Sequence, residues 1–460
     1  MQVVLALCDQ SHSVTYIART AHGRDPYAAM LGNAGIKFLG DDAARLRWMG
    51  RDLQSQWSFE AVLGEGKFDL AILSHWFWSG ISVAEDYLDD IQRLTPNTLV
   101  AVLTDDFHGL RERRAAGLSG EPSGWERSRD FEQRELEIYR RADVVLAISE
   151  TDRAALLAAA PELNIEVIPM AAQVPAPGPE YSKREGLLFL ANFANPASSE
   201  GMTWFLDQVW PIIQRRIPGM TLTLAGNCAP AELAVSGSGI ACIGHVPDLA
   251  PLFMQHRVFV SPILFGTGIK TKNLTALAQG LPLVTTTIGA EGMNLRTGDT
   301  ALIADDPNDF AKEVGRVYTD ADLWSTLAGN GRKHLQKEFS VVQLRARLKR
   351  LVERAIAFRP PRTGSFAPLS IRQVETDFPE VLTHQPGQDR IAERIRGHLK
   401  LAKRLISEGQ PYAARQQLRH ILAFVKSPIP ETPIFEEVGR ALDQCYEELG
   451  ESKPYVDSGM

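Results

Sequence analysis

One short loop carries four residues whose types and spacing suit the binding of a diphosphate: Gly266, Gly268, Lys270 and Lys272. Glycines allow the backbone to approach a ligand closely, and a helix that starts just after the loop presents free amides and its positive dipole end to an anion. In a helix, two lysines separated by one residue lie on different faces. Lys270 and Lys272 can point the same way only if the chain is still irregular at Lys270. We therefore expect one lysine to face the ligand and the other to point elsewhere. The alternative interpretation is a plain strand-loop-helix turn with solvated lysines.

The surrounding segment, residues 258–293, predicts the elements that would position this loop. It reads VFVSPILFGTGIKTKNLTALAQGLPLVTTTIGAEGM. This pattern predicts a strand, a proline-anchored turn, the glycine loop, a helix, a Gly-Leu-Pro break, a second strand and a second glycine loop. The first glycine loop would thus lie between a strand and a helix, where an anion site at a helix amino end is expected.

Short β-rich runs separated by helical stretches continue through most of the chain. Continuous apolar strands that alternate with helices indicate parallel sheets covered on both faces. We therefore predict an α/β fold with two tandem doubly wound, Rossmann-like domains that face a cleft, where a ligand meets strand ends. The predicted strands are 14–17, 68–73, 98–103, 144–148, 165–169, 186–191, 221–225, 258–261, 283–286 and 301–304, with amphipathic helices at 201–217 and 325–358.

Composition shifts set the expected domain limits. A proline-rich stretch at 173–182 (QVPAPGPEYS) reads as a linker, and RPPRTG at 359–364 stops a long helical region. Residues 389–424 and 432–449 carry apolar residues at helical spacing and predict a small helical module that packs on the protein or docks a protein partner or membrane surface. The predicted limits are 1–174 and 175–358 for the two domains, 359–388 for a linker and 389–460 for the C-terminal helical extension.

Bulk properties exclude several classes of protein. The 460 residues are 44% hydrophobic and 23% charged, and no apolar run approaches a membrane span. A net charge of −7 argues against a nucleic-acid partner, and we interpret the Arg-rich pieces at 111–114 and 345–354 as solvated helix faces. The amino end lacks the features of a signal peptide, so a cytoplasmic location is expected. The widely spaced cysteines indicate neither a metal site nor a disulfide framework; they are Cys8, Cys228, Cys242 and Cys445.

Together these blocks resemble the group 1 glycosyltransferase family of GT-B fold, similar to family 4, in the branch whose donor loop reads G-x-G-I-K-x-K before a helix and G-x-P-x-V. Residues 187–226, 244–249 and 141–150 are similar to further units of that family, and 103–114 (LTDDFHGLRERR) looks like its acceptor-side turn. The resemblance implies transfer of a sugar from a nucleoside diphosphate sugar with retention of anomeric configuration. It implies a glycan, lipid-linked or protein acceptor and no metal or other cofactor.

The resemblance also assigns expected roles to individual residues. The catalytic, acceptor-side candidates are Asp105, Asp106 and His108, whose carboxylates and imidazole would orient a hydroxyl. For Asp106 and His108 the alternative is that they cap the helix that continues through Arg111. The donor-binding candidates are Asn192, Phe193, Gly266, Thr267, Gly268, Ile269, Lys270, Lys272, Thr275 and Glu291.

Two features depart from the family pattern. Thr267 and Thr275 stand where family members commonly carry glutamates, and a hydroxyl bonds a ribose more weakly than a carboxylate does. Residues 4–15 resemble the end of the family's first helix and its second strand, so the chain is either shortened or unusual in its first unit. An active glycosyltransferase is the favoured hypothesis. A catalytically weak GT-B-like binding protein that acts through its helical tail is the alternative, and a nucleotide-sugar epimerase fits the loop motif less well.

Overall fold

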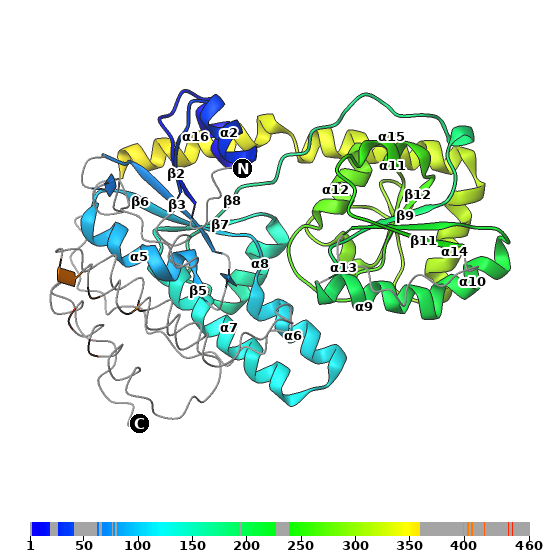
Figure 1. Cartoon of the computed structure of the whole chain (residues 1–460), viewed down its shortest axis with the longest axis horizontal. Helices are drawn as coiled ribbons and strands as arrows, with labels where there is room; N and C mark the ends of the chain where they lie inside the picture. The colour runs from blue at the N-terminus through cyan, green and yellow to red at the C-terminus, as the bar shows by residue number, and fades with distance from the viewer. Residues whose placement is uncertain are drawn as a thin grey trace. The chain divides into compact units, whose positions relative to one another are not determined.

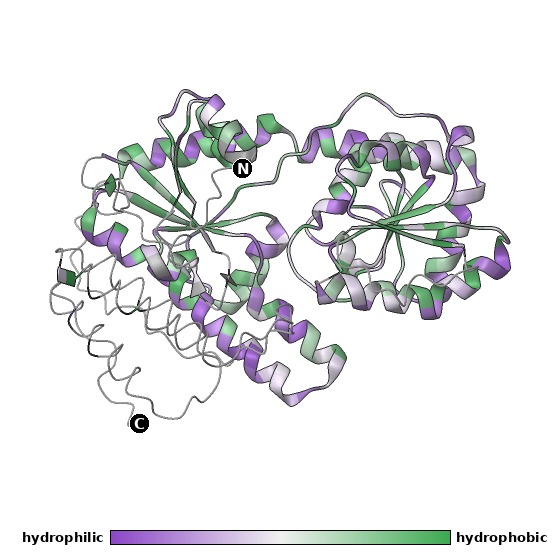
Figure 2. Ribbon diagram, in the orientation of Figure 1, coloured by the Kyte–Doolittle hydropathy of each residue, from purple (hydrophilic) through white to green (hydrophobic). Residues whose placement is uncertain are grey.

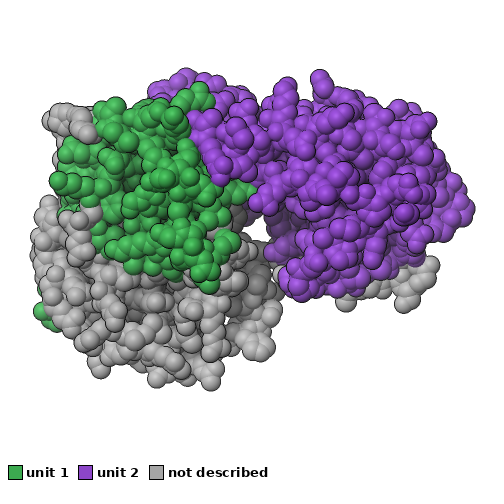
Figure 3. All heavy atoms as spheres, turned by 90° about the horizontal axis from the view of Figure 1, so that it is seen from above, with its two compact units in different colours: residues 1–105, 136–146, 348–460 green, residues 106–135, 147–347 purple. Residues whose placement is uncertain are grey.

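The computed structural model describes residues 2–18, 26–40, 62–63, 67–75, 77–78, 81–193, 195–226 and 239–358, together with residues 399, 403, 406–407, 418, 440 and 444. Contacts divide the chain into two compact units, coloured separately in Figure 3. Unit 1 comprises Met1–Asp105, Leu136–Leu146 and Leu348–Met460, and unit 2 comprises Asp106–Glu135 and Ala147–Arg347. The domain limits expected from the sequence stay predictions. The linker at 359–388 lies outside the described residues, and so does nearly all of the module at 389–460.

The first part of the chain alternates strands and helices (Figure 1). Its elements are α1 (Gln2–Cys8), β1 (Thr15–Ala18), α2 (Pro26–Asn33), β2 (Lys37–Gly40), β3 (Leu70–His75), β4 (Phe77–Trp78), β5 (Ile81–Ser82), α5 (Val83–Leu94), β6 (Leu99–Thr104), α6 (His108–Ser119), α7 (Pro122–Arg141), β7 (Val144–Ala147), α8 (Glu150–Ala159) and β8 (Ile165–Val167).

Parallel pairing in unit 1 follows the apolar runs. Strand β3 pairs in parallel with β6, and β1 pairs in parallel with β2. The larger sheet has the order β3-β6-β7-β8, whose last strand is counted with unit 2. Strand β6 is buried along nearly its whole length because both of its faces are covered, as expected for a continuous apolar strand. Helix α5 begins with a capping box, in which Ser82 and Glu85 satisfy each other's backbone amides.

The second part of the chain continues the alternation. Its elements are the 3₁₀ turn η1 (Tyr181–Lys183), β9 (Leu187–Leu190), α9 (Pro196–Trp204), the π-turn η2 (Phe205–Val209), α10 (Trp210–Arg216), β10 (Leu222–Ala225), β11 (Ile240–Gly244), α11 (Ala250–Gln255), β12 (Val258–Ser261), α12 (Thr271–Ala278), β13 (Leu283–Thr285), α13 (Thr287–Ala290), β14 (Leu302–Ile303), α14 (Pro307–Thr319), α15 (Ala321–Glu338) and α16 (Val341–Ala357).

A six-stranded sheet forms the centre of unit 2, in the order β11-β10-β9-β12-β13-β14. Every neighbouring pair in this sheet is parallel. Numbered from β9, the order is that of a Rossmann domain, and it reverses direction between β9 and β12. Figure 2 shows apolar residues along these strands and mixed apolar and polar faces on the helices around them. The sheet thus has the crevice-forming switch point that α/β proteins use for ligands.

The core of unit 2 lies between this sheet and the helices that follow β9 and β14. Strand residues such as Phe189, Leu224 and Val260 pack there with helix residues such as Phe205 and Phe310, all fully buried. Burial of this apolar surface is the main favourable term that holds helices and sheet together.

The predicted strands are confirmed, with ends that shift by at most two residues. Two predicted helices differ from expectation. The helix expected at 201–217 begins earlier, at Pro196, and contains the π-turn η2. The helical region expected at 325–358 is split into α15 and α16, which are separated at Phe339 and Ser340. Strand β2 and helix α2, which the sequence did not single out, add a further strand-helix unit. Within the described residues, no helix is both long and apolar enough to cross a membrane.

Helix α9 packs so closely on the chain after β12 that Gly201 has no room for a side chain. The Cβ atom of an alanine at this position would lie 1.8 Å from the carbonyl oxygen of Pro262. Overpacking of this kind costs about 1–3 kcal/mol, and we expect Gly201→Ala to lower the free energy of unfolding by roughly 3 kcal/mol because the neighbour is backbone. Urea denaturation measures the change.

Gly329 in helix α15 is the matched control for this substitution. An added Cβ there meets nothing within 4 Å. Gly329→Ala should raise the stability by about 0.5–1 kcal/mol, because alanine is the better helix former. An equal effect of the two substitutions would contradict the close approach of α9 to Pro262.

Candidate functional site

The glycine loop lies at the switch point of the six-stranded sheet. It leaves the carboxyl end of β12 and leads into α12, while Asn192 follows the carboxyl end of the neighbouring strand β9. Ligands of open α/β sheets bind outside the carboxyl ends of strands at this kind of reversal. The topology therefore places two of the predicted donor segments at the edge where a nucleotide is expected.

The loop has a backbone that favours glycine. Gly266 has φ of 133° and Gly268 has φ of 67°, conformations that side chains rarely adopt. Helix α12 then begins with Lys270 as its N-cap residue, no side chain caps the helix, and its first turn holds no acidic residue. The positive dipole end of α12 thus carries two lysines, which repel it, and lacks the usual acidic compensation.

Lys272 is one of the two lysines at this positively charged helix end. Its Nζ donates to the Ser198 hydroxyl at 3.2 Å and lies 4.5 Å from the centre of the Phe189 ring. Burial and, to a smaller extent, the charge of Lys270 lower the pKa of Lys272 to about 7. No ion pair among the described residues includes Lys272. An anion bound here would supply the charge partner that the protein withholds.

Lys270 is placed differently. Its Nζ donates to the carbonyl oxygens of Thr267 at 3.0 Å and Gly268 at 2.7 Å, so the side chain folds back over its own loop. Burial lowers the pKa of Lys270, and the carboxylates of Glu291, Asp106 and Asp152 oppose that shift. The two lysines thus diverge, as their spacing predicts, because Lys270 is the extended residue before the helix.

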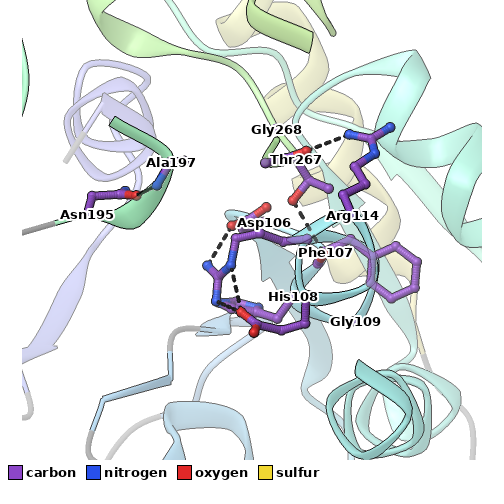
Figure 4. Close-up of polar contacts among 12 residues, drawn as sticks. Asp106, Phe107, His108, Gly109, Arg114, Asn195, Ala197, Thr267 and Gly268 are labelled. Atoms are coloured by element: carbon purple, nitrogen blue, oxygen red, sulfur yellow. Dashed lines mark hydrogen bonds and ion pairs between the residues drawn. The ribbon is translucent and has the colours of Figure 1, made fainter. Parts of the chain in front are cut away.

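Arg114 of α6 connects the glycine loop to the turn at Glu291. Its guanidinium donates two hydrogen bonds of 2.7 Å to the Glu291 carboxylate and one of 2.5 Å to the Gly266 carbonyl oxygen. Beside it, the Thr267 hydroxyl donates to the carbonyl oxygen of Phe107 at 3.3 Å (Figure 4). The hydrogen bonds to Glu291 and the nearby negative charges raise the pKa of Arg114. Glu291, a predicted donor ligand, is therefore engaged by an arginine.

The start of helix α6 is capped by a residue of another helix, and this corrects the expected capping by Asp106 and His108. Phe107 is the N-cap residue and makes no side-chain cap bond. Instead, Glu135 of α7 accepts from the amides of His108 at 3.0 Å and Gly109 at 2.9 Å, and lies 2.6 Å from His108 Nδ1. Both side chains are buried. His108 is thus held at the helix start by a carboxylate from a neighbouring helix.

The acidic candidates Asp106 and Asp105 also have defined partners, and so does Asp152, which was not a candidate. Asp106 pairs with Arg111 at 2.9 Å, although its second oxygen is buried without a hydrogen-bond partner in the described part of the chain. Asp105, in unit 1, accepts a 2.7 Å hydrogen bond from the Ser74 hydroxyl. Asp152 accepts from the Ser149 hydroxyl at 2.5 Å, and burial raises its pKa against that hydrogen bond. The interpretation of residues 111–114 as a solvated face is wrong for Arg111 and Arg114, because both are paired.

The remaining donor candidates have mixed settings. Asn192 is exposed, whereas Phe193 is only 4% exposed and packs on Phe189 in the core of unit 2. Ile269 is buried, and Thr275 is exposed on α12 with its hydroxyl donating to the carbonyl oxygen of Thr271 at 3.0 Å. The Phe193 side chain therefore faces the core, and of these two neighbours Asn192 is the one with an exposed side chain.

The sequence analysis gave no site role to four residues that the structure brings to the predicted site residues. Ser198, Glu135 and Arg114 each form a hydrogen bond with one of them, and the charge of Asp152 opposes the lowering of the Lys270 pKa. Arg114 and Glu291 are separated by 177 positions, and Glu135 and His108 by 27. Of these four residues, only Ser198 carried a local signal: it lies in the first turn of α9, three residues after Asn195, and helix amino ends are frequent anion sites.

The strand order and the loop after β12 define a domain of the Rossmann type. Residues 184–320 of this domain match the family model described as "Glycosyl transferases group 1". YtcC of Bacillus subtilis (strain 168), which is provisionally named a glycosyltransferase, is 30% identical over 129 residues, 27% of this chain and 31% of its own length. The chain spans 42% and 31% of the lengths of the curated relatives that it matches.

Solved structures extend the likeness to most of the described fold. Sucrose-phosphate synthase from Thermosynechococcus elongatus superposes with a TM-score of 0.60 at 17% identity, over 77% of this chain and 92% of that one. Anabaena Alr3699/HepE in complex with UDP and glucose gives a TM-score of 0.54 at 12% identity, over 76% and 95%. The fold is that of the GT-B glycosyltransferases, as predicted.

Proposed function

We propose that this protein is a glycosyltransferase that moves a sugar from a nucleoside diphosphate sugar to an acceptor hydroxyl with retention, in glycan or glycoconjugate synthesis. The family match of residues 184–320 and the GT-B fold support the reaction class. Alr3699/HepE, which shares the fold, is a complex with UDP and glucose, and this makes uridine donors the first to test.

One observation carries the proposal: the amino end of α12 holds two lysines, and its first turn holds no acidic residue. A buried cation without an ion-pair partner, such as Lys272, is costly, and a helix dipole of the same sign increases that cost. A diphosphate bound at this end removes both penalties, and it gains the Ser198 hydroxyl next to Lys272. The contacts favour Lys272 over Lys270 as the main diphosphate ligand, which reverses the order expected from the sequence.

The chemistry follows from positioning and charge. Sugar transfer needs stabilisation of the leaving diphosphate and an acceptor hydroxyl held against the anomeric carbon. In this proposal Lys272 and the α12 amides stabilise the leaving group, and Asp106 and His108 lie on the acceptor side. The cations take the role that a metal has in other transferases, so we propose that no metal or cofactor is required. EDTA should then leave transfer unchanged.

Calorimetric titration of the folded protein with UDP-, GDP-, ADP- and TDP-sugars tests the proposal, followed by donor hydrolysis and by NMR of the product anomer. We expect one nucleotide series to bind in the micromolar range, near −8 kcal/mol. Lys270→Ala should weaken that binding by roughly tenfold, because the loop loses a charge-assisted donor.

Failure of every donor to bind to protein that circular dichroism shows to be folded would overturn the proposal. Equal binding by Lys270→Ala would remove only the role given to that residue. A product of inverted configuration would contradict retention and leave the donor class intact.

A further inference from the structure

We propose that Arg114 is a positioning residue of this site, which holds the glycine loop at Gly266 and the turn at Glu291 in one arrangement ready for the donor. What the loop binds rests on the proposed function, whereas the holding of the loop rests on contacts alone. The sequence pattern indicates only a solvated helix face at Arg114, whereas its three hydrogen bonds join two segments that contain predicted donor residues.

The geometry suits arginine in particular. A guanidinium carries donors in a flat fork, so it can bind a carboxylate with two hydrogen bonds and still reach another acceptor. Here Arg114 donates two hydrogen bonds to the Glu291 carboxylate and one to the Gly266 carbonyl oxygen. Lysine has a single ammonium, and it cannot match both carboxylate oxygens and a carbonyl oxygen in this way.

Arg114 acts from a firmly anchored helix. The first turn of α6 is fixed by the buried carboxylate of Glu135, and the Ser128 hydroxyl donates to the carbonyl oxygen of Gly109 at 2.9 Å. A side chain on Gly109 would lie 2.6 Å from the Cβ atom and 2.7 Å from the Cα atom of Glu132, so the backbones of α6 and α7 approach closely there. The arginine is therefore held by a rigid support, as a positioning group must be.

The loop needs such support. Gly266 and Gly268 have no side chains of their own to fix the backbone, and glycine loses more conformational freedom on ordering than other residues do. Glu291 also needs a partner, because its carboxylate lies close enough to Lys270 to affect the pKa of that lysine. Without Arg114, Glu291 would attract Lys270 away from the loop carbonyls. One arginine thus orders the loop and keeps Lys270 on it.

Hydrogen exchange of the ligand-free protein tests the inference, with Arg114→Met, Arg114→Lys and Arg113→Met compared with the unchanged protein. Arg113 is the matched control: it lies on the same helix, is 45% exposed and pairs with Glu132 at 3.6 Å. We expect Arg114→Met to speed exchange of the amides at 264–270 by about tenfold or more, since ordered backbone is released. Arg114→Lys should be intermediate and Arg113→Met unchanged.

Donor titration supplies a second readout. Arg114→Met should weaken binding of the donor by about 10–30-fold, because the loop must now be ordered on binding. If Arg114→Met does not fold, Glu291→Gln takes its place, since it keeps the shape of the side chain and removes the charge. Exchange at 264–270 that is unchanged in the folded Arg114 or Glu291 variant, or equally fast in Arg113→Met, would overturn the inference. If no donor binds to the unchanged protein, the proposed function fails. The hydrogen-exchange result still decides whether Arg114 orders the loop.

Discussion

Replacing Lys272 with methionine is expected to remove most donor binding and, at the same time, to raise the free energy of unfolding at neutral pH. Lys272 belongs to the first turn of α12, and its side chain lies over the Phe189 ring of β9. Mainly because of burial, its pKa falls there from 10.5 to about 7. Methionine fills similar space without a charge and packs well against an aromatic ring. Loss of a residue that stabilises the fold would have the opposite effect on stability.

The sign of the stability change follows from proton binding. Between pH 7 and 10.5 the unfolded chain binds the Lys272 proton and the folded chain has released it, so the stability of the unchanged protein rises with pH across this window. Below pH 7 the full penalty of the buried charge is present. After allowance for partial exposure of the side chain, Lys272→Met should raise the free energy of unfolding by on the order of 2–4 kcal/mol at pH 7.

Urea denaturation between pH 6 and 10 measures this gain, and the gain should shrink as the pH rises. Calorimetry with the best donor should show binding weakened by about 100-fold or more in the variant, because a desolvated charge-assisted contact to phosphate is lost. In the unchanged protein, donor affinity should fall as the pH rises above about 7, where free Lys272 loses its proton. Lys337→Met is the matched control, since that side chain is 83% exposed. Donor binding by Lys272→Met equal to that of Lys337→Met would refute the assignment.

Substitution of Glu135 with alanine is expected to cause the largest loss of stability. This carboxylate is 0% exposed, and it accepts from two backbone amides at the start of α6 and lies 2.6 Å from His108 Nδ1. A carboxylate only accepts, so the imidazole carries hydrogen on Nδ1 in this contact. Each buried donor left without an acceptor costs about 1–3 kcal/mol, which gives an expected total of roughly 3–5 kcal/mol after non-additivity.

Glu132→Gln is the control for this substitution, because Glu132 lies on the same helix, is 23% exposed and forms a 3.6 Å ion pair with Arg113. Such partly exposed pairs contribute about 0–1 kcal/mol. Glu135→Gln should fall between the two, since one amide oxygen can still accept. Equal denaturation midpoints for Glu135→Ala and Glu132→Gln would show that the α6 start is held by something other than this carboxylate.

The sequence was sufficient for the strands, the glycine loop and the divergence of the lysines, because each depends on neighbours only a few positions away. Apolar runs identified β9 and β12, and the spacing of Lys270 and Lys272 predicted that they would part. The anchoring of α6 was not readable, because Glu135 reaches His108 from another helix. The pairing of Arg114 with Glu291 depends in the same way on tertiary contact.

Phe193 shows a different limit of sequence reasoning. Its place just after a strand predicts the ligand edge, but a large apolar side chain gains more from the core, where it meets Phe189. Asn192, one residue earlier, is the exposed one. Position along a strand predicts where the backbone ends, whereas the polarity of the side chain decides which way it turns.

The π-turn between α9 and α10 has a consequence for comparison with other chains. Its hydrogen bonds span one residue more than those of an α-helix, so η2 holds one residue in excess of a regular helix. Phe205 at the start of the π-turn and Trp210 directly after its end nevertheless face the same core. An alignment with relatives in which this helix is continuous should therefore place a single-residue gap between Trp204 and Trp210, and deletion of one residue there should preserve the register of α10.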